Sequence, residues 1–184
     1  MQADSEARVE ESVTFDQVKE AARKNGILLQ LQSVGLPGFI WFRAVAEKER
    51  DGQVLGVVIG WQVPFTSLVH FDSLRVKPQK EQAEESKSLM GIGLYLAAAA
   101  FAWAVDNNFA TGELLAIDDD FYTHKRLVKY YQRYGFKVVR YVGNNGLRDL
   151  ADLLVWGGAG TLMSGDMHVL NKRWSRAIRR QLSK

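Results

Sequence analysis

The sequence predicts an α/β protein of the α+β type, with helices flanking a mixed, mostly antiparallel central sheet. Four strand-like runs follow one another closely before residue 77. A buried-type helix, a short strand, a second helix and further strands come after them. Closely spaced strands pair antiparallel, whereas a strand–helix–strand order is a crossover pattern. The 184 residues fit one domain. We assign it to residues 14–184 and expect a flexible N-terminus over 1–13.

The first half of the chain reads as one helix followed by an antiparallel meander. Thr14 and Gln17 have the spacing of a capping box, which predicts a short, surface-lying helix that runs to Asn25 and ends at Gly26. Asp51 and Gly52 form a strong hairpin signal between the second and third of the strands that follow. These strands are expected at residues 27–34, 39–46, 54–63 and 67–76.

The second half contains two internal helices. Residues 91–108 are apolar almost all round and rich in alanine, as expected of a helix buried between two layers. The polar stretch 77–89 before it is expected to be a loop, at least at its start. Gly135 is expected to end the second helix, which carries an apolar face. The remaining elements are strands at 114–117, 136–142 and 153–156, and a basic amphipathic helix at 166–181.

Composition excludes several kinds of chemistry. The chain has no cysteine, so disulfides and thiolate catalysis are excluded, and its three histidines are far apart in sequence, which disfavours a metal site. The N-terminus is acidic and does not resemble a targeting peptide. The longest apolar run, over 91–105, is shorter than the roughly 20 residues that span a bilayer. We expect a soluble intracellular protein, cytoplasmic by default, although a removed organelle-targeting peptide would leave no trace.

Gly91 and Gly93 lie where a strand feeds through a loop into a helix. Free N–H groups and the positive end of the helix dipole suit a pyrophosphate at such a place, and glycine lets phosphates approach the backbone. Close packing of the helix on the sheet is the alternative explanation for these two glycines.

The run from Ser88 to Leu94, S-L-M-G-I-G-L, resembles motif A of the GNAT superfamily of N-acetyltransferases. The run from Lys129 to Phe136, K-Y-Y-Q-R-Y-G-F, resembles motif B of the same superfamily. The resemblance covers about residues 54–142 and implies a GNAT fold. It also implies acetyl-CoA as cosubstrate and direct acetyl transfer to a primary amine of a small molecule or polypeptide. The residues expected to bind acetyl-CoA are Leu74, Val76, Ser88, Leu89, Met90, Gly91, Ile92, Gly93, Leu94 and His124.

The resemblance also suggests catalytic residues. Tyr131 occupies the position of the general acid that protonates the departing thiolate; packing beside Leu127 and Tyr134 is the alternative. His70 and Asp72 alternate with apolar residues, so both are expected on one face of their strand, as the base or its proton-wire partners. An ordinary polar pair on a solvated strand face is the alternative for them.

Several departures from the superfamily pattern keep other functions open. Ser88 stands where motif A has Gln or Arg, His124 stands where an asparagine is common, and the loop before Gly91 is longer than usual. A CoA-binding module without catalysis is therefore the second hypothesis. The third is a nucleic-acid or ribosome-associated protein that uses the basic C-terminal helix, although no aromatic stacking motif accompanies the charge. A homodimer remains open, with Trp156 and Trp174 as core or contact residues.

Overall fold

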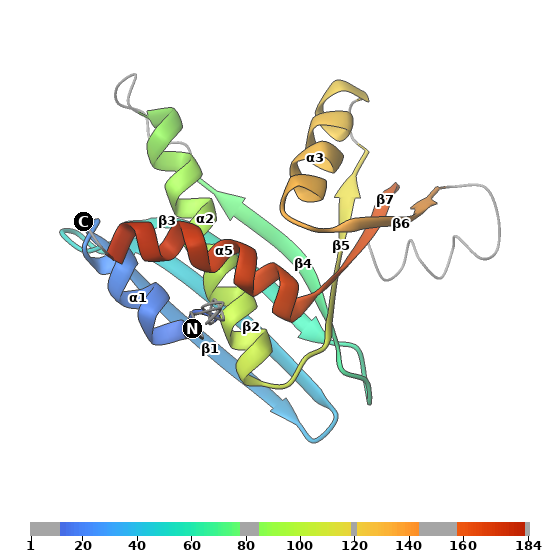
Figure 1. The fold of residues 1–184 in the computed structure, drawn as a ribbon, viewed down its shortest axis with the longest axis horizontal. Helices are drawn as coiled ribbons and strands as arrows, with labels where there is room; N and C mark the ends of the chain where they lie inside the picture. The colour runs from blue at the N-terminus through green and yellow to red at the C-terminus, as the bar shows by residue number, and fades with distance from the viewer. Residues whose placement is uncertain (1–11, 78–84, 119–120, 144–157, 183–184) are drawn as a thin grey trace, which may run out of the picture.

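The computed structural model describes residues 12–77, 85–118, 121–143 and 158–182 of the chain. Within these residues, seven strands form one sheet in the order β1-β2-β3-β4-β5-β7-β6 (Figure 1). The elements are α1 (Phe15–Arg23), β1 (Ile27–Leu36), β2 (Phe39–Lys48), β3 (Val54–Gln62), β4 (Leu68–Val76), α2 (Glu85–Asp106), β5 (Thr111–Ile117), α3 (Phe121–Arg133), β6 (Lys137–Val142), β7 (Gly160–Asp166) and α5 (Met167–Leu182).

The sheet is mixed and mostly antiparallel, which confirms the predicted fold class. Strands β1 to β4 form an antiparallel meander. The crossover through α2 makes β4 and β5 a parallel pair. Strand β7 then pairs antiparallel with both β5 and β6. The parallel pair therefore stands near the middle of the sheet, between two antiparallel parts.

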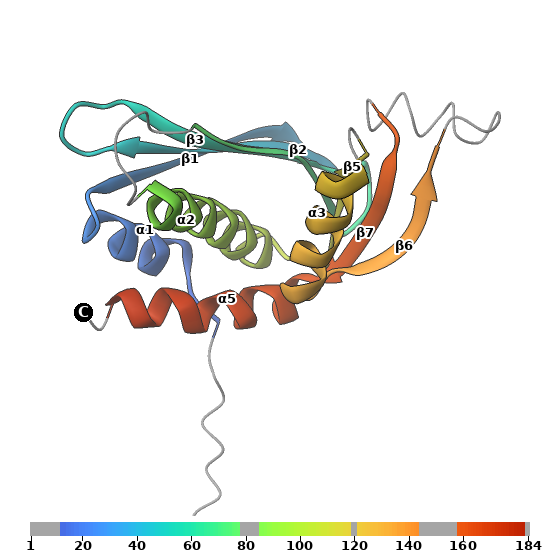
Figure 2. The same cartoon turned by 90° about the horizontal axis from the view of Figure 1, so that it is seen from above.

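The helices gather on one side of the curved sheet. Figure 2 shows α2 and α1 against β1 to β3, with α5 on their far side and α3 in front of β5 and β7. Helix α2 is the centre of the core, and its alanines from Ala97 to Ala100 are all buried. Trp103 of α2 stacks on Phe42 of β2 with ring centroids 4.3 Å apart. No helix in the described part of the chain is long and apolar enough to cross a bilayer.

Helix α1 begins as predicted. The Thr14 hydroxyl accepts from the Gln17 backbone N–H at 3.3 Å, and the Gln17 side chain accepts from the Thr14 N–H at 3.1 Å. The helix ends at Arg23, slightly before the expected Asn25, and Gly26 follows with a φ of 71°. Although α1 is short, it buries Val18 and two alanines. It is therefore part of the core rather than a surface helix.

Helix α2 begins at Glu85, six residues before Gly91, and this corrects the predicted start. The polar composition of residues 77–89 had suggested a loop, at least at its start. Glu and Lys are good helix formers, however, so a polar stretch can form the first turns of a helix without contributing apolar periodicity. Gly91 and Gly93 therefore lie inside α2 and not at its start.

Strand β7 was not predicted. Glycine usually weakens a strand, and the segment around Gly160 is rich in it. Here a Cβ at Gly160 would come 2.3 Å from the carbonyl oxygen of Ala116, so glycine is required by the close approach of β5. The strand expected at 153–156, and Trp156 within it, lie outside the described residues.

Helix α5 matches the prediction within one residue at each end. The Asp166 carboxylate accepts from the Val169 N–H at 2.9 Å and caps the helix. Its buried side includes Leu170, Trp174 and Ile178. Trp174 contacts both Phe101 of α2 and Tyr134 of α3, with ring centroids 5.4 Å and 4.3 Å away. This helix therefore joins the two internal helices.

Candidate functional site

A cleft opens where the two parallel strands separate. Strands β4 and β5 pair only from Leu68 and Thr111 to Phe71 and Leu114. Beyond these pairs the strands diverge (Figure 1), and a cavity of about 480 Å³ lies there. Residues of β4, β5, α2, α3 and α5 line it. A cleft of this size is in the range that binds small molecules and cofactors.

A β-bulge shapes the β4 side of the cleft. Ile59 of β3 pairs with Ser73, and the next residue, Gly60, pairs with Phe71, so Asp72 is an extra residue in β4. A bulge leaves its extra residue outside the ladder of backbone hydrogen bonds and bends the strand. Asp72 is exposed and lines the cleft. Both its N–H group and its carboxylate are therefore available at the point where the strands part.

The bulge overturns the expectation that His70 and Asp72 share a face. Phe71 lines the cleft, so its neighbour His70 points to the opposite side of the sheet. There His70 stacks on Trp61 with centroids 4.6 Å apart, and its Nδ1 lies 3.7 Å from Glu113 Oε1. The His70 side chain is only 1% exposed. The structure therefore brings Asp72, but not His70, to the cleft.

The α2 wall of the cleft is made of small residues. Gly93, Ala97, Ala100 and Phe101 line it at helical spacing. A Cβ at Gly93 would meet only a methyl carbon of Val76 at 3.8 Å, and one at Gly91 would meet nothing within 4 Å.

Gly56 of β3 differs from these two glycines. A Cβ there would lie 2.8 Å from the Arg75 carbonyl oxygen and 2.9 Å from Leu96 of α2. Close packing of helix on sheet therefore explains Gly56, but it does not explain Gly91 or Gly93. The absence of a side chain at Gly93 leaves room for a ligand in the cleft.

The position of the first turn of α2 decides which backbone N–H groups can bind a phosphate, and this turn lies before Gly91. Because α2 begins at Glu85, the N–H groups of residues 91–94 lie within the helical ladder, and the helical N–H groups without an intrahelical partner belong to residues 85–87. Leu74 lines the cleft as expected, whereas Ile92 is buried in the core. The side chains of Ser88, Leu89 and Met90 lie outside the described residues.

The α3 wall carries two tyrosines. Leu127, Tyr130 and Tyr131 line the cleft from this helix. Burial raises the pKa of Tyr131, so its phenol stays protonated at neutral pH and can act as a hydrogen-bond donor. The Tyr131 ring also packs edge-on against Phe136, with centroids 5.9 Å apart. The predicted position of Tyr131 beside the cleft is therefore compatible with either a packing role or a catalytic one.

Aromatic rings close the inner end of the cleft. Phe101 lies at the centre of this group, with its centroid 5.4 Å from Phe71, 6.1 Å from Phe136 and 5.4 Å from Trp174. All four rings are buried. Sequence reasoning had given Trp174 only a core or contact role, because its place on the apolar face of α5 does not show which cavity that face covers.

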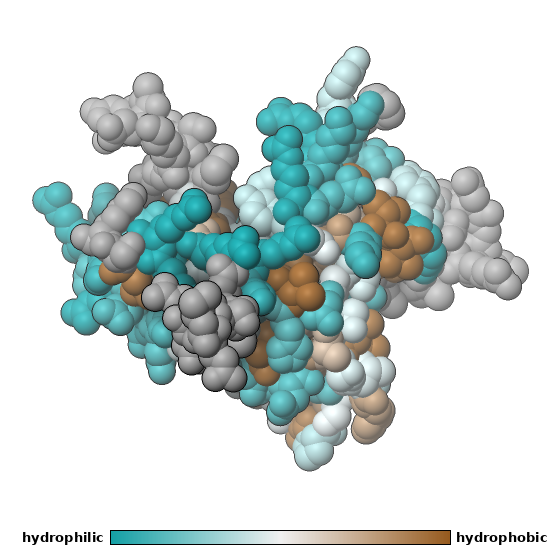
Figure 3. All heavy atoms as spheres, viewed as in Figure 1, coloured by the Kyte–Doolittle hydropathy of each residue, from teal (hydrophilic) through white to brown (hydrophobic). Residues whose placement is uncertain are grey.

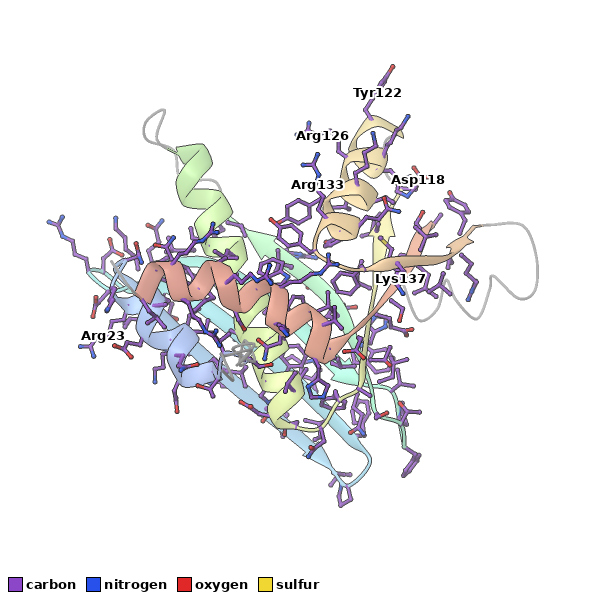
Figure 4. All side chains as sticks on the ribbon, viewed as in Figure 1. Arg23, Asp118, Tyr122, Arg126, Arg133 and Lys137 are labelled. Atoms are coloured by element: carbon purple, nitrogen blue, oxygen red, sulfur yellow. The ribbon has the colours of Figure 1, made fainter. Side chains whose placement is uncertain are left out.

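Two arginines stand on the side of α3 that faces α2. Figure 4 shows Arg126 and Arg133 on this side, whereas Asp118 lies on the other. Arg126 is one turn before Tyr130, which lines the cleft. In the described part of the chain, neither arginine is recorded in an ion pair. Figure 3 shows hydrophilic side chains over this side of the molecule. Arg126 is four residues before Tyr130, and this helical spacing could have indicated from the sequence that Arg126 lies near the cleft.

His124 is turned toward β7 and away from the cleft. Its Nε2 lies 3.0 Å from the Thr161 hydroxyl, and its Nδ1 lies 3.6 Å from Asp118 Oδ1. Tyr141 of β6 donates to the other carboxylate oxygen of Asp118 at 2.7 Å. His124 is not among the residues that line the cleft, and its contact with the cofactor stays a prediction.

Comparison with known proteins gives similarity in structure only. No family model matches the sequence, and no curated protein matches it significantly. Among solved structures, Tetrahymena GCN5 is 16% identical, with 70% of this chain and 69% of that chain covered and a TM-score of 0.47. A probable GNAT-family acetyltransferase from Chromobacterium violaceum is 12% identical, with coverages of 73% and 61% and a TM-score of 0.46.

A third similar structure is the Paia N-acetyltransferase from Thermoplasma acidophilum in complex with coenzyme A. It is 12% identical, with 70% of this chain and 61% of that chain covered and a TM-score of 0.40. Two of these three structures are described as acetyltransferases, one of them as a member of the GNAT family. All three TM-scores are below 0.5, so the activity has to be argued from the cleft itself.

Proposed function

We propose that this chain is an N-acetyltransferase that moves an acetyl group from acetyl-CoA directly to a primary amine. The observation that carries the proposal is the cleft between β4 and β5. A strand bulge at Asp72, a glycine and alanine wall from α2 and the half-buried phenol of Tyr131 meet there. This arrangement leaves space for the extended pantetheine arm of acetyl-CoA and places polar groups in the inner part of the cleft.

The cleft residues fit a CoA thioester. Within the described residues, the part of β4 beyond the bulge has no strand partner on the β5 side, so its backbone around Leu74 can pair with the amides of the pantetheine arm. Gly93 leaves the opposite wall open. The free N–H groups of the first turn of α2 and the guanidinium of Arg126 supply positive charge for the phosphates.

The residues around Asp72 and Tyr131 match the proton movements of the reaction. The amine must lose a proton to attack the thioester carbonyl, and the departing thiolate gains one. We assign the Asp72 N–H to the carbonyl oxygen as a hydrogen-bond donor, and the Asp72 carboxylate to the amine as a base or orienting group. Tyr131 donates its proton to the thiolate. His70 remains a second candidate for the base, but it could serve only an amine that reached the other face of β4.

The test is a screen of acceptors combined with a binding measurement. Acetyl-CoA is incubated with polyamines, aralkylamines, aminoglycosides and peptides with free amino termini, and release of the CoA thiol is followed. Binding of CoA is measured separately by calorimetry. Thiol release that depends on one acceptor class supports the proposal. Binding without release across the whole panel would favour a CoA-binding module without catalysis, and absence of binding would reject both readings.

A further inference from the structure

Helix α3 packs one face against the core, and both of its ends make further contacts. At its C-terminal end, Tyr134 stacks on Trp174, and Arg173 Nη1 donates to the Arg133 carbonyl oxygen at 3.4 Å. At its N-terminal end, the attachment is polar and runs through His124. Tyr122 in the same first turn is 77% exposed, so it adds little packing there. Among the described side chains of this end, His124 provides the polar contacts to Thr161 and Asp118.

The polar attachment joins α3 to three strands. The Thr161 hydroxyl of β7 lies 3.0 Å from His124 Nε2 in a largely buried position. Asp118, directly after β5, faces Nδ1 at 3.6 Å and is held in turn by the Tyr141 hydroxyl of β6. The 3.6 Å contact is too long for a hydrogen bond, so the bond to Thr161 is the main directional contact of the ring.

His124 and Tyr131 lie on the same stripe of α3. They are seven residues apart, close to two full turns, and Leu127 and Val128 stand between them on that stripe. Both residues between them pack against the core. A helix moves as a rigid rod over two turns, so a shift of His124 relative to β7 is passed on to the depth of Tyr131 in the cleft.

We propose that His124 is a positioning residue that, through its hydrogen bond to Thr161, fixes the place of Tyr131 in the cleft. His124 itself touches neither the thioester nor the amine. The inference rests on the proposed function insofar as Tyr131 is the proton donor. It predicts that the Thr161 hydroxyl, on a strand that does not carry any catalytic group, influences the rate of the reaction.

The first test separates the hydroxyl from the shape of its side chain. Thr161→Val removes the oxygen and keeps the branched shape, so kcat is expected to fall about three- to tenfold, the loss that one net hydrogen bond would cause. The KM for acetyl-CoA should change less than kcat. Thr161→Ser restores the hydroxyl and should restore most of the rate. Lys129→Ala, an exposed position on α3, serves as the control and should leave kcat unchanged. A wild-type kcat in Thr161→Val would overturn the proposal.

A double-mutant cycle asks whether the effect passes through Tyr131. In a Tyr131→Phe background there is no phenol to position, so Thr161→Val should have little further effect on kcat. An equal fold-loss in both backgrounds would mean that Thr161 acts by another route and would overturn the inference.

The third measurement does not depend on the catalytic role of Tyr131. Hydrogen–deuterium exchange of the amides over 121–131 is compared between the wild type and Thr161→Val. Faster exchange confined to α3 supports the attachment through His124. Unchanged exchange in Thr161→Val would reject the attachment through His124. This outcome can be read whether or not Tyr131→Phe identifies Tyr131 as the proton donor.

Discussion

His70 and Asp72 lie on different sides of β4 although they are only two residues apart. The extra residue that makes the bulge is Asp72 itself, so the alternation of side chains is interrupted there. Asp72 consequently lines the cleft, while His70 is stacked beneath Trp61 on the other face. The two residues can therefore be separated by experiment.

We expect Asp72→Asn to lower kcat by about 10²-fold, the lower end of what a general base contributes. The amide keeps the size of the side chain and the backbone bulge, so CoA affinity should be retained. His70→Gln should have a much smaller effect on kcat at equal folded concentration. Steady-state rates with a true acceptor across pH 6 to 9 check this pair. A larger loss in His70→Gln than in Asp72→Asn would move the base to the other face of the sheet.

Arg126 is expected to hold a phosphate of CoA at the mouth of the cleft. Arg126→Ala should weaken CoA binding about tenfold, as expected for loss of a charge-assisted hydrogen bond worth roughly 1.5 kcal/mol. The difference should shrink at high ionic strength because the site is exposed. Lys129→Ala removes a charge from an exposed position on the same helix and is the matched control.

S-acetylpantetheine, which lacks the nucleotide phosphates, distinguishes this role of Arg126 from a general effect on the cleft. Its binding should be the same in the wild type and in Arg126→Ala. Equal weakening of both ligands would show that Arg126 acts on the shape of the cleft and not on the phosphates.

Tyr131→Phe tests the proton donor. The ring keeps its packing against Phe136, so folding and CoA affinity should be close to those of the wild type. We expect kcat to fall by about 10²-fold, because water can partly replace the phenol. The rates are compared with a true acceptor under conditions where the chemical step limits turnover. Turnover at the wild-type rate over pH 6 to 9 would reduce Tyr131 to a packing residue.

Alkaline solution should destabilise the fold through three tyrosines whose pKa is raised in the folded chain. Burial raises the pKa of Tyr95, Tyr130 and Tyr131 in the folded chain. Above about pH 10, the ordinary tyrosine pKa, the unfolded chain loses these protons while the folded chain retains them. The unfolded state then binds fewer protons, and the free energy of unfolding falls as pH rises.

Denaturant unfolding of the wild type and of Tyr131→Phe between pH 8 and 11 measures this effect. The fall above pH 10 should be smaller in the variant, which has one buried phenol fewer. Contributions of groups that do not interact with Tyr131 cancel in the comparison, whereas the pKa of the neighbouring Tyr130 also falls slightly when Tyr131 is replaced. Parallel curves for the two proteins would show that Tyr131 is not protected from ionisation by the fold.

The sequence predicted the order of elements well where local signals and tertiary structure agree. The capping box at Thr14 and Gln17 forms as expected. The predicted hairpin lies around Gly52, which has a φ of 68°. The bounds of α5 were also predicted closely, since Asp166 caps it and its apolar stripe is long. In each case a few neighbouring residues determine the local structure.

The errors occur where distant residues decide the structure. The bulge at Asp72 depends on how β3 pairs with β4, and no residue type marks it in the sequence. Strand β7 contains glycine because β5 approaches it closely at Ala116. The role of Trp174 at the end of the cleft depends on where α5 crosses α2 and α3. Sequence patterns show that such residues are buried but not what they face.

The most direct test of the central claim is a calorimetric titration of acetyl-CoA into the wild type and into Gly93→Leu. A Cβ at residue 93 would meet only a methyl group of Val76 at 3.8 Å, and the rest of the leucine would extend along the open cleft, so the fold should tolerate it. Leucine also removes the cost of glycine in a helix, about 1 kcal/mol, and the thermal midpoint should not fall. The cleft, however, would be filled along its α2 wall. We predict binding of one acetyl-CoA per wild-type chain and at least tenfold weaker binding to the folded variant; equal affinity for both proteins would contradict the assignment of this cleft.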